Sequence, residues 1–544
     1  MKGKWIKWIF KRIKGAYKHL VLLVFSSVLL SIVNILLALI LKGFIDSAVS
    51  GTAEKVFRLI VYAVIVVLLE GFSYVLSSYS KKNIQARTEY NLRSEMFSAV
   101  IRADYADTEK YSSGELINMF SNDINAVSTC IPEITYNIAG QLLQAVSAGV
   151  VLFIISWKMG LILFITIPFL MLLISSISPY IQKANAELKE NEDYIISYVQ
   201  ERLRRIPLIK AYRYYEKPMR KFNAMQKDKT KKYTKLGIIE GLVFFSNNII
   251  GSVMFLICLG VGSIFAIKGS YSVGAMITMV QLLNYIILPI NTLPPAINSI
   301  NNSLVSAERI SNIINLAQEA NALPERNVKI KEIVIDNLGF SYGSNKIFTG
   351  LSCRFPGNKI VGIIGKSGRG KTTLLKLLLG FYAPDSGNIS VVTEDDQTLD
   401  IRDVKALISY VPNSDILFSD TIAENIAMSE EANLSRLTDV SSQANILGFI
   451  ESLPGKFETV ISEYGGNLSS GQAQRIGIAR AIYRESVQVI LLDEPTANLD
   501  SESVNVQKRE LKNLSRDKMC IVVSHDSNLK DIFDVTLNLD DTGL

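Results

Sequence analysis

The placement of its apolar residues constrains this chain more than any other feature. These residues make up 49% of the 544 positions, and they gather before about residue 300 in long runs. A helix that crosses a membrane needs roughly 20 mostly apolar residues. Runs of this kind occupy residues 19–42, 57–79, 133–156, 159–181, 239–267 and 274–298. We therefore predict an all-α, multi-pass membrane domain of six helices, followed by a soluble domain.

The links between these runs alternate in length and charge. Those after the first, third and fifth runs are short, whereas those after the second and fourth are long and rich in Lys and Arg. Basic loops stay on the cytosolic side of a membrane. The long links, both chain ends and the soluble domain are therefore expected in the cytosol. Periodic apolar residues in the long links predict helical extensions of the membrane spans.

Charge and composition exclude several other classes of protein. The net charge is +6, and residues 2–18 carry lysines and one arginine but no acid. Because this segment runs into an apolar stretch, we expect contact with membrane lipids and no nucleic-acid partner. Trp5, Trp8 and Phe10 suit a short helix at the membrane interface, and a flank that only sets topology fits equally well. The four cysteines and two histidines have no metal-binding spacing, so neither a metal enzyme nor a disulfide framework is expected.

One carboxylate interrupts the second apolar run. Glu70 stands midway along it, where a charge facing lipid is unfavourable. We therefore expect Glu70 to face the interior of the helix bundle. Two interpretations remain open, a contact between helices and a site for a cationic or polar group of a transported molecule.

The soluble part follows a polar segment. Residues 318–327 include Pro324 and predict a linker between a membrane domain at 1–317 and a second domain at 328–544. Strand-like runs such as 333–336 and 359–364 alternate there with helical patterns. This alternation predicts an α/β domain with a largely parallel sheet.

A glycine-rich turn follows the strand expected at residues 359–364. It reads Gly365-Lys-Ser-Gly-Arg-Gly-Lys-Thr372, the pattern of a phosphate-binding P-loop between a strand and a helix. Backbone amides of such a loop surround phosphates, Lys371 would reach the β- and γ-phosphates, and Thr372 would bind Mg²⁺. The predicted nucleotide contacts here are Gly365, Lys366, Ser367, Gly368, Arg369, Gly370, Lys371, Thr372 and Thr373.

An apolar strand pattern at residues 489–492 leads directly into Asp493 and Glu494. A carboxylate at the carboxyl end of a strand suits a Mg²⁺ shell, and its neighbour suits activation of an attacking water. We predict Asp493 as a metal residue and Glu494 as the general base. An ordinary acidic surface pair would not explain the apolar strand before it.

Between these two motifs lies Leu468-Ser-Ser-Gly-Gln472. This combination of motifs resembles the ABC transporter superfamily, whose signature reads Leu-Ser-Gly-Gly-Gln. In that family the signature of one subunit closes over ATP held by the P-loop of the other. The resemblance therefore implies a dimer, ATP and Mg²⁺. It also implies contacts to the partner's ATP from Ser469, Ser470, Gly471 and Gln472, of which Ser470 replaces a glycine.

Further positions follow from the same resemblance. Tyr342 matches the aromatic residue that stacks on adenine, and a tyrosine of the domain core is the alternative. Residues 497–500 resemble the loop that crosses the dimer interface and ends at Asp500. His525 matches the catalytic histidine that senses the γ-phosphate. Asn413 stands where the family has glutamine between Mg²⁺, water and the membrane domain, so coupling is expected to differ while hydrolysis is kept.

The resemblance covers nearly the whole chain. Residues 114–123, 209–216, 307–310 and 459–463 resemble segments of exporter-type members with the type IV fold. Six spans and one ATPase domain make half of the usual transporter. The resemblance thus implies a translocase in the cytoplasmic membrane that exports a peptide or an amphipathic or hydrophobic small molecule.

Alternatives remain for assembly and cargo. A homodimer is the simplest assembly, and a heterodimer with a sister subunit stays open. A lipid flippase, an importer of the same fold, and an ATP-gated channel or regulator are the other functions to be weighed. The membrane spans exclude a soluble ABC ATPase.

Overall fold

The computed structural model describes residues 2–319, 328–413, 417–429, 431–462, 468–496 and 501–541. The chain divides into two compact units. The first, here the helical unit, comprises Met1–Ile101 and Ser112–Leu316. The second, here the sheet unit, comprises Arg102–Tyr111 and Ala317–Leu544. The sheet unit thus includes a short segment, Arg102–Tyr111, that interrupts the helical unit in the sequence.

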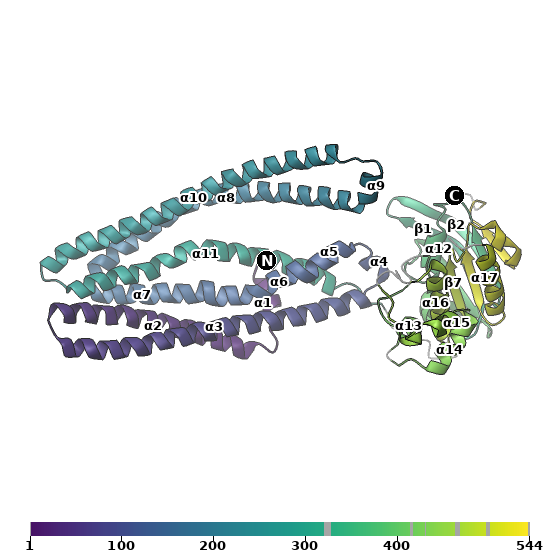
Figure 1. Cartoon of the computed structure of the whole chain (residues 1–544), viewed down its shortest axis with the longest axis horizontal. Helices are drawn as coiled ribbons and strands as arrows, with labels where there is room; N and C mark the ends of the chain where they lie inside the picture. The colour runs from purple at the N-terminus through teal and green to yellow at the C-terminus, as the bar shows by residue number, and fades with distance from the viewer. Residues whose placement is uncertain are drawn as a thin grey trace. The chain divides into compact units, whose positions relative to one another are not determined.

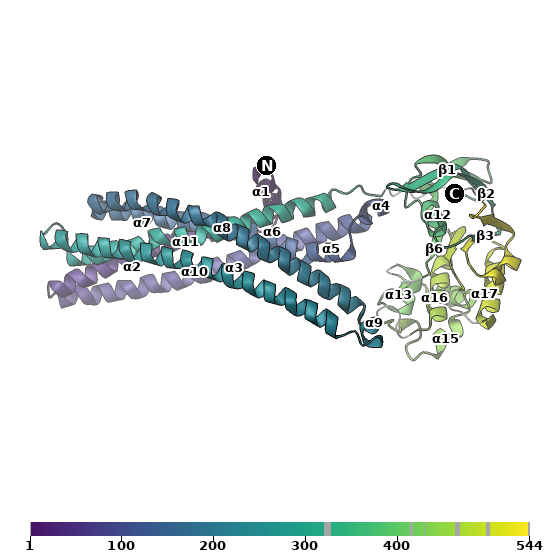
Figure 2. The ribbon, with the colours of Figure 1, turned by 90° about the horizontal axis from the view of Figure 1, so that it is seen from above.

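Helices form the whole of the described helical unit (Figure 1). In chain order they are α1 (Lys2–Lys11), α2 (Tyr17–Val49), α3 (Ala53–Arg102), α5 (Ser113–Asn118), η1 (Met119–Asp123), α6 (Ile124–Pro132), η2 (Glu133–Gly140), α7 (Gln141–Ile155), α8 (Trp157–Arg204), α9 (Ile206–Ala211), α10 (Glu216–Ile267) and α11 (Val273–Ile314). Figures 1 and 2 both show α8 and α10 running side by side, joined at one end by α9.

Four described segments are long and apolar enough to cross a membrane. They are Tyr17–Val49, Ala53–Arg102, Ser113–Ile155 and Val273–Ile314. The expected spans 159–181 and 239–267 fall in α8 and α10, where many side chains lie outside the described residues. The 50 residues of α3 extend over about 75 Å at 1.5 Å per residue, far beyond a hydrocarbon core of about 30 Å. The predicted helical extensions are confirmed.

Small polar residues let the first helices approach closely. The Ser73 hydroxyl donates to the backbone oxygen of Ser26 at 2.8 Å, and Ser31 and Ser147 share a hydrogen bond of 2.7 Å. Such contacts are typical of helices that pack inside a membrane. An apolar cluster formed by buried residues of α2, α7, α8, α10 and α11 completes this packing.

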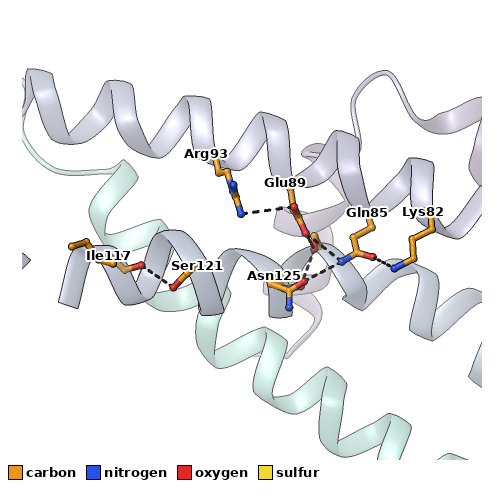
Figure 3. A network of polar contacts seen from close by, with 8 residues as sticks. Lys82, Gln85, Glu89, Arg93, Ile117, Ser121 and Asn125 are labelled. Atoms are coloured by element: carbon orange, nitrogen blue, oxygen red, sulfur yellow. Dashed lines mark hydrogen bonds and ion pairs between the residues drawn. The ribbon is translucent and has the colours of Figure 1, made fainter. Parts of the chain in front are cut away.

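Polar contacts join the extension of α3 to its neighbours. Gln85 donates to Asn125 on α6 at 3.0 Å, and Ser128 donates to Glu89 at 3.3 Å (Figure 3). Arg12, just beyond α1, pairs with Glu95 at 2.6 Å. The helix predicted within residues 2–18 is present as α1. Its position at a membrane interface stays a prediction.

Two sheets organise the sheet unit. The antiparallel sheet has the order β2 (Asn345–Pro356), β1 (Ile330–Tyr342), β4 (Ser386–Thr393), β5 (Thr398–Asp400). The parallel sheet has the order β6 (Ile408–Val411), β7 (Val489–Asp493), β8 (Met519–Val523), β3 (Ile360–Ile364), β9 (Val535–Asn538). The α-helices of the sheet unit are α4 (Tyr105–Thr108), in the segment Arg102–Tyr111, and α12 (Lys371–Leu378), α13 (Ile422–Ala427), α14 (Leu434–Gln443), α15 (Leu447–Ser452), α16 (Ser470–Tyr483) and α17 (Ser501–Leu514).

The parallel sheet is covered on both faces. Along β7, Ile490 and Leu492 belong to one apolar core, whereas Val489 and Leu491 belong to the other. Because side chains alternate along a strand, the two cores lie on opposite faces of the sheet. This explains the continuous apolar sequence of the strand, which is typical of parallel sheets.

Candidate functional site

The predicted catalytic groups follow four neighbouring strands of the parallel sheet. The glycine-rich loop follows β3, Asp493 ends β7, His525 comes two residues after β8, and Asn413 comes two residues after β6. These strands are adjacent in the order β6-β7-β8-β3 and run in one direction. Ligands bind at the carboxyl edge of such sheets. The topology therefore brings residues from distant parts of the sequence to one edge.

The loop depends on glycine at specific positions. Gly368 and Gly370 both have φ of +83°, a left-handed conformation that side chains disfavour. A Cβ added to Gly370 would lie 2.6 Å from Ile347 Cγ2 and 2.9 Å from Phe348 Cζ. Helix α12 starts at the next residue, so its free amides border the loop.

Lys371 lies inside this loop. Its ammonium group donates to the backbone oxygens of Gly365 at 2.8 Å and Lys366 at 3.0 Å. Burial lowers the pKa of Lys371, while the carboxylates of Glu494 and Asp493 act in the opposite direction. The buried cation is thus held where a phosphate chain would meet the start of α12.

Thr372 and Asp493 form a pair of oxygen donors beside this lysine. The Thr372 hydroxyl donates to Asp493 Oδ2 at 3.2 Å. Burial raises the pKa of Asp493. Burial, followed by the contact with Asp493, raises the pKa of Tyr410. Hydroxyl and carboxylate oxygens suit Mg²⁺, which usually keeps waters and substrate phosphates as its other ligands. Within the described ranges no three His, Cys, Asp or Glu residues gather as a metal-binding group.

Glu494 is the centre of a second polar cluster. Its Oε1 lies 2.9 Å from His525 Nε2, and its Oε2 accepts a hydrogen bond from the Asn413 side chain at 3.3 Å. Its backbone has φ of +50°, which is unusual for a residue with a side chain. The structure therefore brings together the predicted general base, the predicted γ-phosphate sensor and the residue in the glutamine position.

Tyr342 belongs to an aromatic cluster. Its ring meets the rings of Phe340 and Tyr382 edge-on, with centroids 5.0 Å and 5.4 Å apart, and 37% of the residue is exposed. Tyr105, from the segment before α5, stacks on Phe381 with centroids 4.5 Å apart. Sequence reasoning missed Tyr382, Phe381 and Tyr105 because none belongs to a recognised motif.

Asp540 is another residue that sequence reasoning missed. It accepts a hydrogen bond from the backbone amide of Lys366 at 3.2 Å, and Arg369 Nε lies 3.4 Å from it. Asp540 follows β9, the neighbour of β3 in the sheet. Counting strands to the end of the chain would have placed an acid beside the loop.

The turn before α16 carries the signature residues. The Ser469 hydroxyl accepts a hydrogen bond from the Gln472 amide at 3.2 Å, and the Gln472 side chain accepts one from the Ser469 amide at 2.8 Å. This is a capping box, in which the first and fourth residues bond reciprocally. Ser470 and Gly471 form the first helical positions, so the start of α16 is an ordered, exposed helix terminus.

Some predicted residues lie outside the described part of the chain. These are residues 497–500, including Asp500, together with residues 414–416, Glu463 and residues 320–327 of the predicted linker. Their predicted roles stay predictions.

Comparisons with known proteins found matches to both parts of the chain. Residues 20–290 match the family model described as the ABC transporter transmembrane region, and residues 348–497 match the model described as ABC transporter. A putative export ATP-binding/permease protein of Rickettsia bellii is 26% identical over 93% of this chain and 89% of its own length. An ATP-dependent lipid A-core flippase of Cupriavidus metallidurans is 24% identical over 96% and 89%. A probable ABC transporter ATP-binding/permease protein of Haemophilus influenzae is 27% identical over 82% of each.

Proposed function

The chain belongs to the ABC transporter superfamily, and from this premise we propose that two copies of it form one exporter with two shared ATP sites. Its ATPase domain and its relatives support ATP binding, ATP hydrolysis coupled to transport, and ATP-driven export through a membrane. The proposal concerns the catalytic residues, the assembly, the orientation and the cargo.

The cluster at Glu494 carries the catalytic part of the proposal. Its carboxylate is fixed by His525 at 2.9 Å and Asn413 at 3.3 Å. Held this way, it would accept a proton from a water that attacks the γ-phosphate of ATP. His525 keeps the carboxylate oriented, and Asn413 would contact the water from the opposite side.

The neighbouring groups would bind the substrate ATP. Lys371 and the loop amides would hold its phosphates, and Tyr342 would stack on the adenine with its exposed ring. Thr372 and Asp493 would hold Mg²⁺, with Asn413 close by, and the metal would neutralise negative charge on the phosphates. Ser469 and Gly471 of the other copy would close the site from above.

Exposed apolar residues support assembly with a second subunit. Around α9, Leu203, Leu208 and Tyr212 are 60%, 55% and 80% exposed. These residues lie in a basic segment outside the expected membrane spans, so contact with lipid does not explain their exposure. Exposed apolar groups of this kind mark contact surfaces. We propose that this end docks on the second subunit, and that the second subunit is an identical copy, because one chain supplies both halves of each ATP site.

Charge and the relatives support a proposal for the orientation and the cargo. Because the long links between the apolar runs are basic, we propose that the sheet unit lies in the cytosol and the helical unit in the cytoplasmic membrane. A peptide or an amphipathic small molecule is the proposed cargo. Lipid flipping is the second candidate, because one relative is named as a flippase of lipid A-core.

Glu494→Gln tests the catalytic assignment. The amide keeps the shape and both neighbours but cannot accept the proton, so we expect ATP turnover to fall about 10²–10⁴-fold. The variant should still bind ATP. This binding would be measured by equilibrium titration of the full-length protein in lipid nanodiscs. Glu451→Gln, at an exposed position of α15, is the matched control and should hydrolyse ATP at the wild-type rate. Turnover of Glu494→Gln within a few-fold of wild type would refute the assignment.

Co-expression of two differently tagged copies tests the assembly. Capture of one tag should retain the other, and the captured complex should hydrolyse ATP. Recovery of the chain only with a different ABC subunit from its native membrane would replace the homodimer by a heterodimer.

A further inference from the structure

The helical unit contains a polar cavity of about 250 Å³. It lies among α2, α3, the η2–α7 segment and α11. Its polar and aromatic lining includes Asn34, Glu70, Tyr74, Tyr136, Gln144 and Tyr285. None of the described residues that line it is a lysine, an arginine or a histidine. The prediction that Glu70 faces the bundle interior is thereby confirmed.

Glu70 brings an uncompensated carboxylate to this cavity. Among the described residues, no hydrogen bond or ion pair involves its side chain, although it stands midway along an apolar run. Lys81, the next basic residue along α3, is already engaged, because its ammonium lies 3.1 Å from the Tyr136 ring centroid and it interacts with Glu133. A half-buried acid at this place in an apolar run, without a paired cation, is unfavourable in a membrane and marks a functional site.

Three phenol rings accompany this carboxylate. Tyr74 lies one helical turn from Glu70 on α3, whereas Tyr136 and Tyr285 come from η2 and α11. The Tyr285 hydroxyl accepts a hydrogen bond from the Gln281 side chain at 3.3 Å, which fixes the ring's position on α11. Aromatic faces attract cations, and several rings around one site recognise quaternary ammonium groups.

The size of the cavity restricts what enters it. Sites that enclose a whole drug-sized ligand measure about 300–1,000 Å³. A volume of about 250 Å³ suits a head group whose attached tail stays outside the cavity. Leu288 lines the cavity and is also exposed, so an apolar side chain at its edge can contact such a tail.

We propose that this cavity binds the ammonium head group of an amphipathic organic cation. The inference rests on the proposed export function for its biological role and gives the chemical class of the cargo. The Glu70 carboxylate supplies the counter-charge, and the rings of Tyr74 and Tyr285 supply faces for the N-methyl or N–H groups. Anionic cargo finds no positive side chain among the described lining residues.

The test compares one cation with its neutral isostere. Benzyltrimethylammonium and neopentylbenzene have the same shape and differ in charge. Their equilibrium binding would be measured with the full-length protein in nanodiscs of phosphatidylglycerol. We expect wild type to bind the cation at least tenfold more tightly. Glu70→Gln should remove most of this preference while changing affinity for the isostere less than twofold.

Two further variants separate a binding role from a structural one. Tyr74→Phe keeps the aromatic face and should keep the cation preference, whereas Tyr74→Leu should reduce it several-fold. Glu54→Gln is the matched control, since Glu54 lies on the same helix, is exposed and pairs with Arg58. It should bind the cation as wild type does. If Glu70→Gln does not fold, as judged by thermal unfolding, Glu70→Asp and Tyr74→Leu carry the test.

The outcomes distinguish this inference from the proposed function. An equal affinity of wild type for cation and isostere, or an unchanged preference in Glu70→Gln, overturns the cation site whatever the ATPase rate. Wild-type protein without ATP hydrolysis overturns the proposed function and leaves the binding result standing. Displacement of the probe by phosphatidylethanolamine supports the ammonium site and identifies a lipid amine as its source. Displacement only by free amines supports a soluble cation.

Discussion

Two different substitutions of Ser469 can distinguish its role in stability from its proposed role in catalysis. Ser469 caps α16 through a hydrogen bond of 3.2 Å and is proposed to face the γ-phosphate of ATP on the other subunit. Ser469→Ala removes the cap, and loss of such a cap costs about 0.5–2 kcal/mol of stability. Ser469→Asp keeps an equivalent cap, because aspartate is as good an N-cap residue as serine.

The two variants should therefore have opposite effects: Ser469→Ala mainly lowers stability, whereas Ser469→Asp mainly lowers ATPase activity. An added negative charge about 4 Å from a phosphate charge is repelled by about 4 kcal/mol at an effective dielectric constant of 20. This corresponds to a loss of about 10³-fold in a rate or binding constant. Ser469→Asp should thus unfold at the wild-type temperature and lose nearly all ATPase activity. Ser469→Ala should unfold at a lower temperature and keep more activity than Ser469→Asp.

Thermal unfolding and ATP turnover of the full-length protein in nanodiscs would be measured side by side. Gln472→Ala is a useful companion, because it removes the reciprocal bond of 2.8 Å without adding charge. Substantial ATPase activity in Ser469→Asp would refute the proposed contact with phosphate. Wild-type stability in Ser469→Ala would refute the argument from the capping box.

Two other predictions concern the ATP site. Asn413→Gln lengthens the amide that reaches Glu494 and should stay folded, with turnover within about tenfold of wild type but altered stimulation by cargo. Unchanged basal and stimulated rates would show that this position does not limit coupling. Gly370→Ala forces a strained φ and a contact of 2.6 Å with Ile347, so its ATP affinity should fall further than that of Gly368→Ala. Gly368 has the same φ but open space around it, and equal ATP affinities of the two variants in equilibrium titration would contradict the steric argument.

Much of the ATP site could be predicted because each of its motifs is continuous in sequence and follows an apolar strand. Lys371, Asp493 and His525 follow or end β3, β7 and β8, and parallel neighbours bring the ends of such strands together. Asp540 and Tyr382 belong to no such motif. Asp540 meets the loop through the order of the strands, because β9 neighbours β3, and Tyr382 lies in the turn after α12.

The helical unit shows the same contrast. Glu70 was recognisable because a carboxylate within an apolar run is energetically unfavourable and therefore informative. Tyr136 and Tyr285 were not recognisable as its companions, since tyrosine is common near membrane interfaces and both come from other helices. The contact of Arg12 with Glu95 also joins residues far apart in the chain. A sequence pattern therefore predicts the local environment of a residue, such as an apolar run, more readily than the residues that contact it from other helices.

The backbone of Glu494 explains why one feature of the site could not be inferred at all. A φ of +50° ordinarily favours glycine or asparagine, so sequence reasoning would assign no left-handed residue there. Strain of about 1–3 kcal/mol persists only where the surroundings enforce it, and here the backbone amide bonds to Val523 at 2.9 Å while the carboxylate contacts His525. Glycine would relieve the strain but would remove the carboxylate. Residue 494 must both adopt the backbone conformation of the turn after β7 and carry the proposed proton acceptor. A glutamate with a strained backbone meets both requirements.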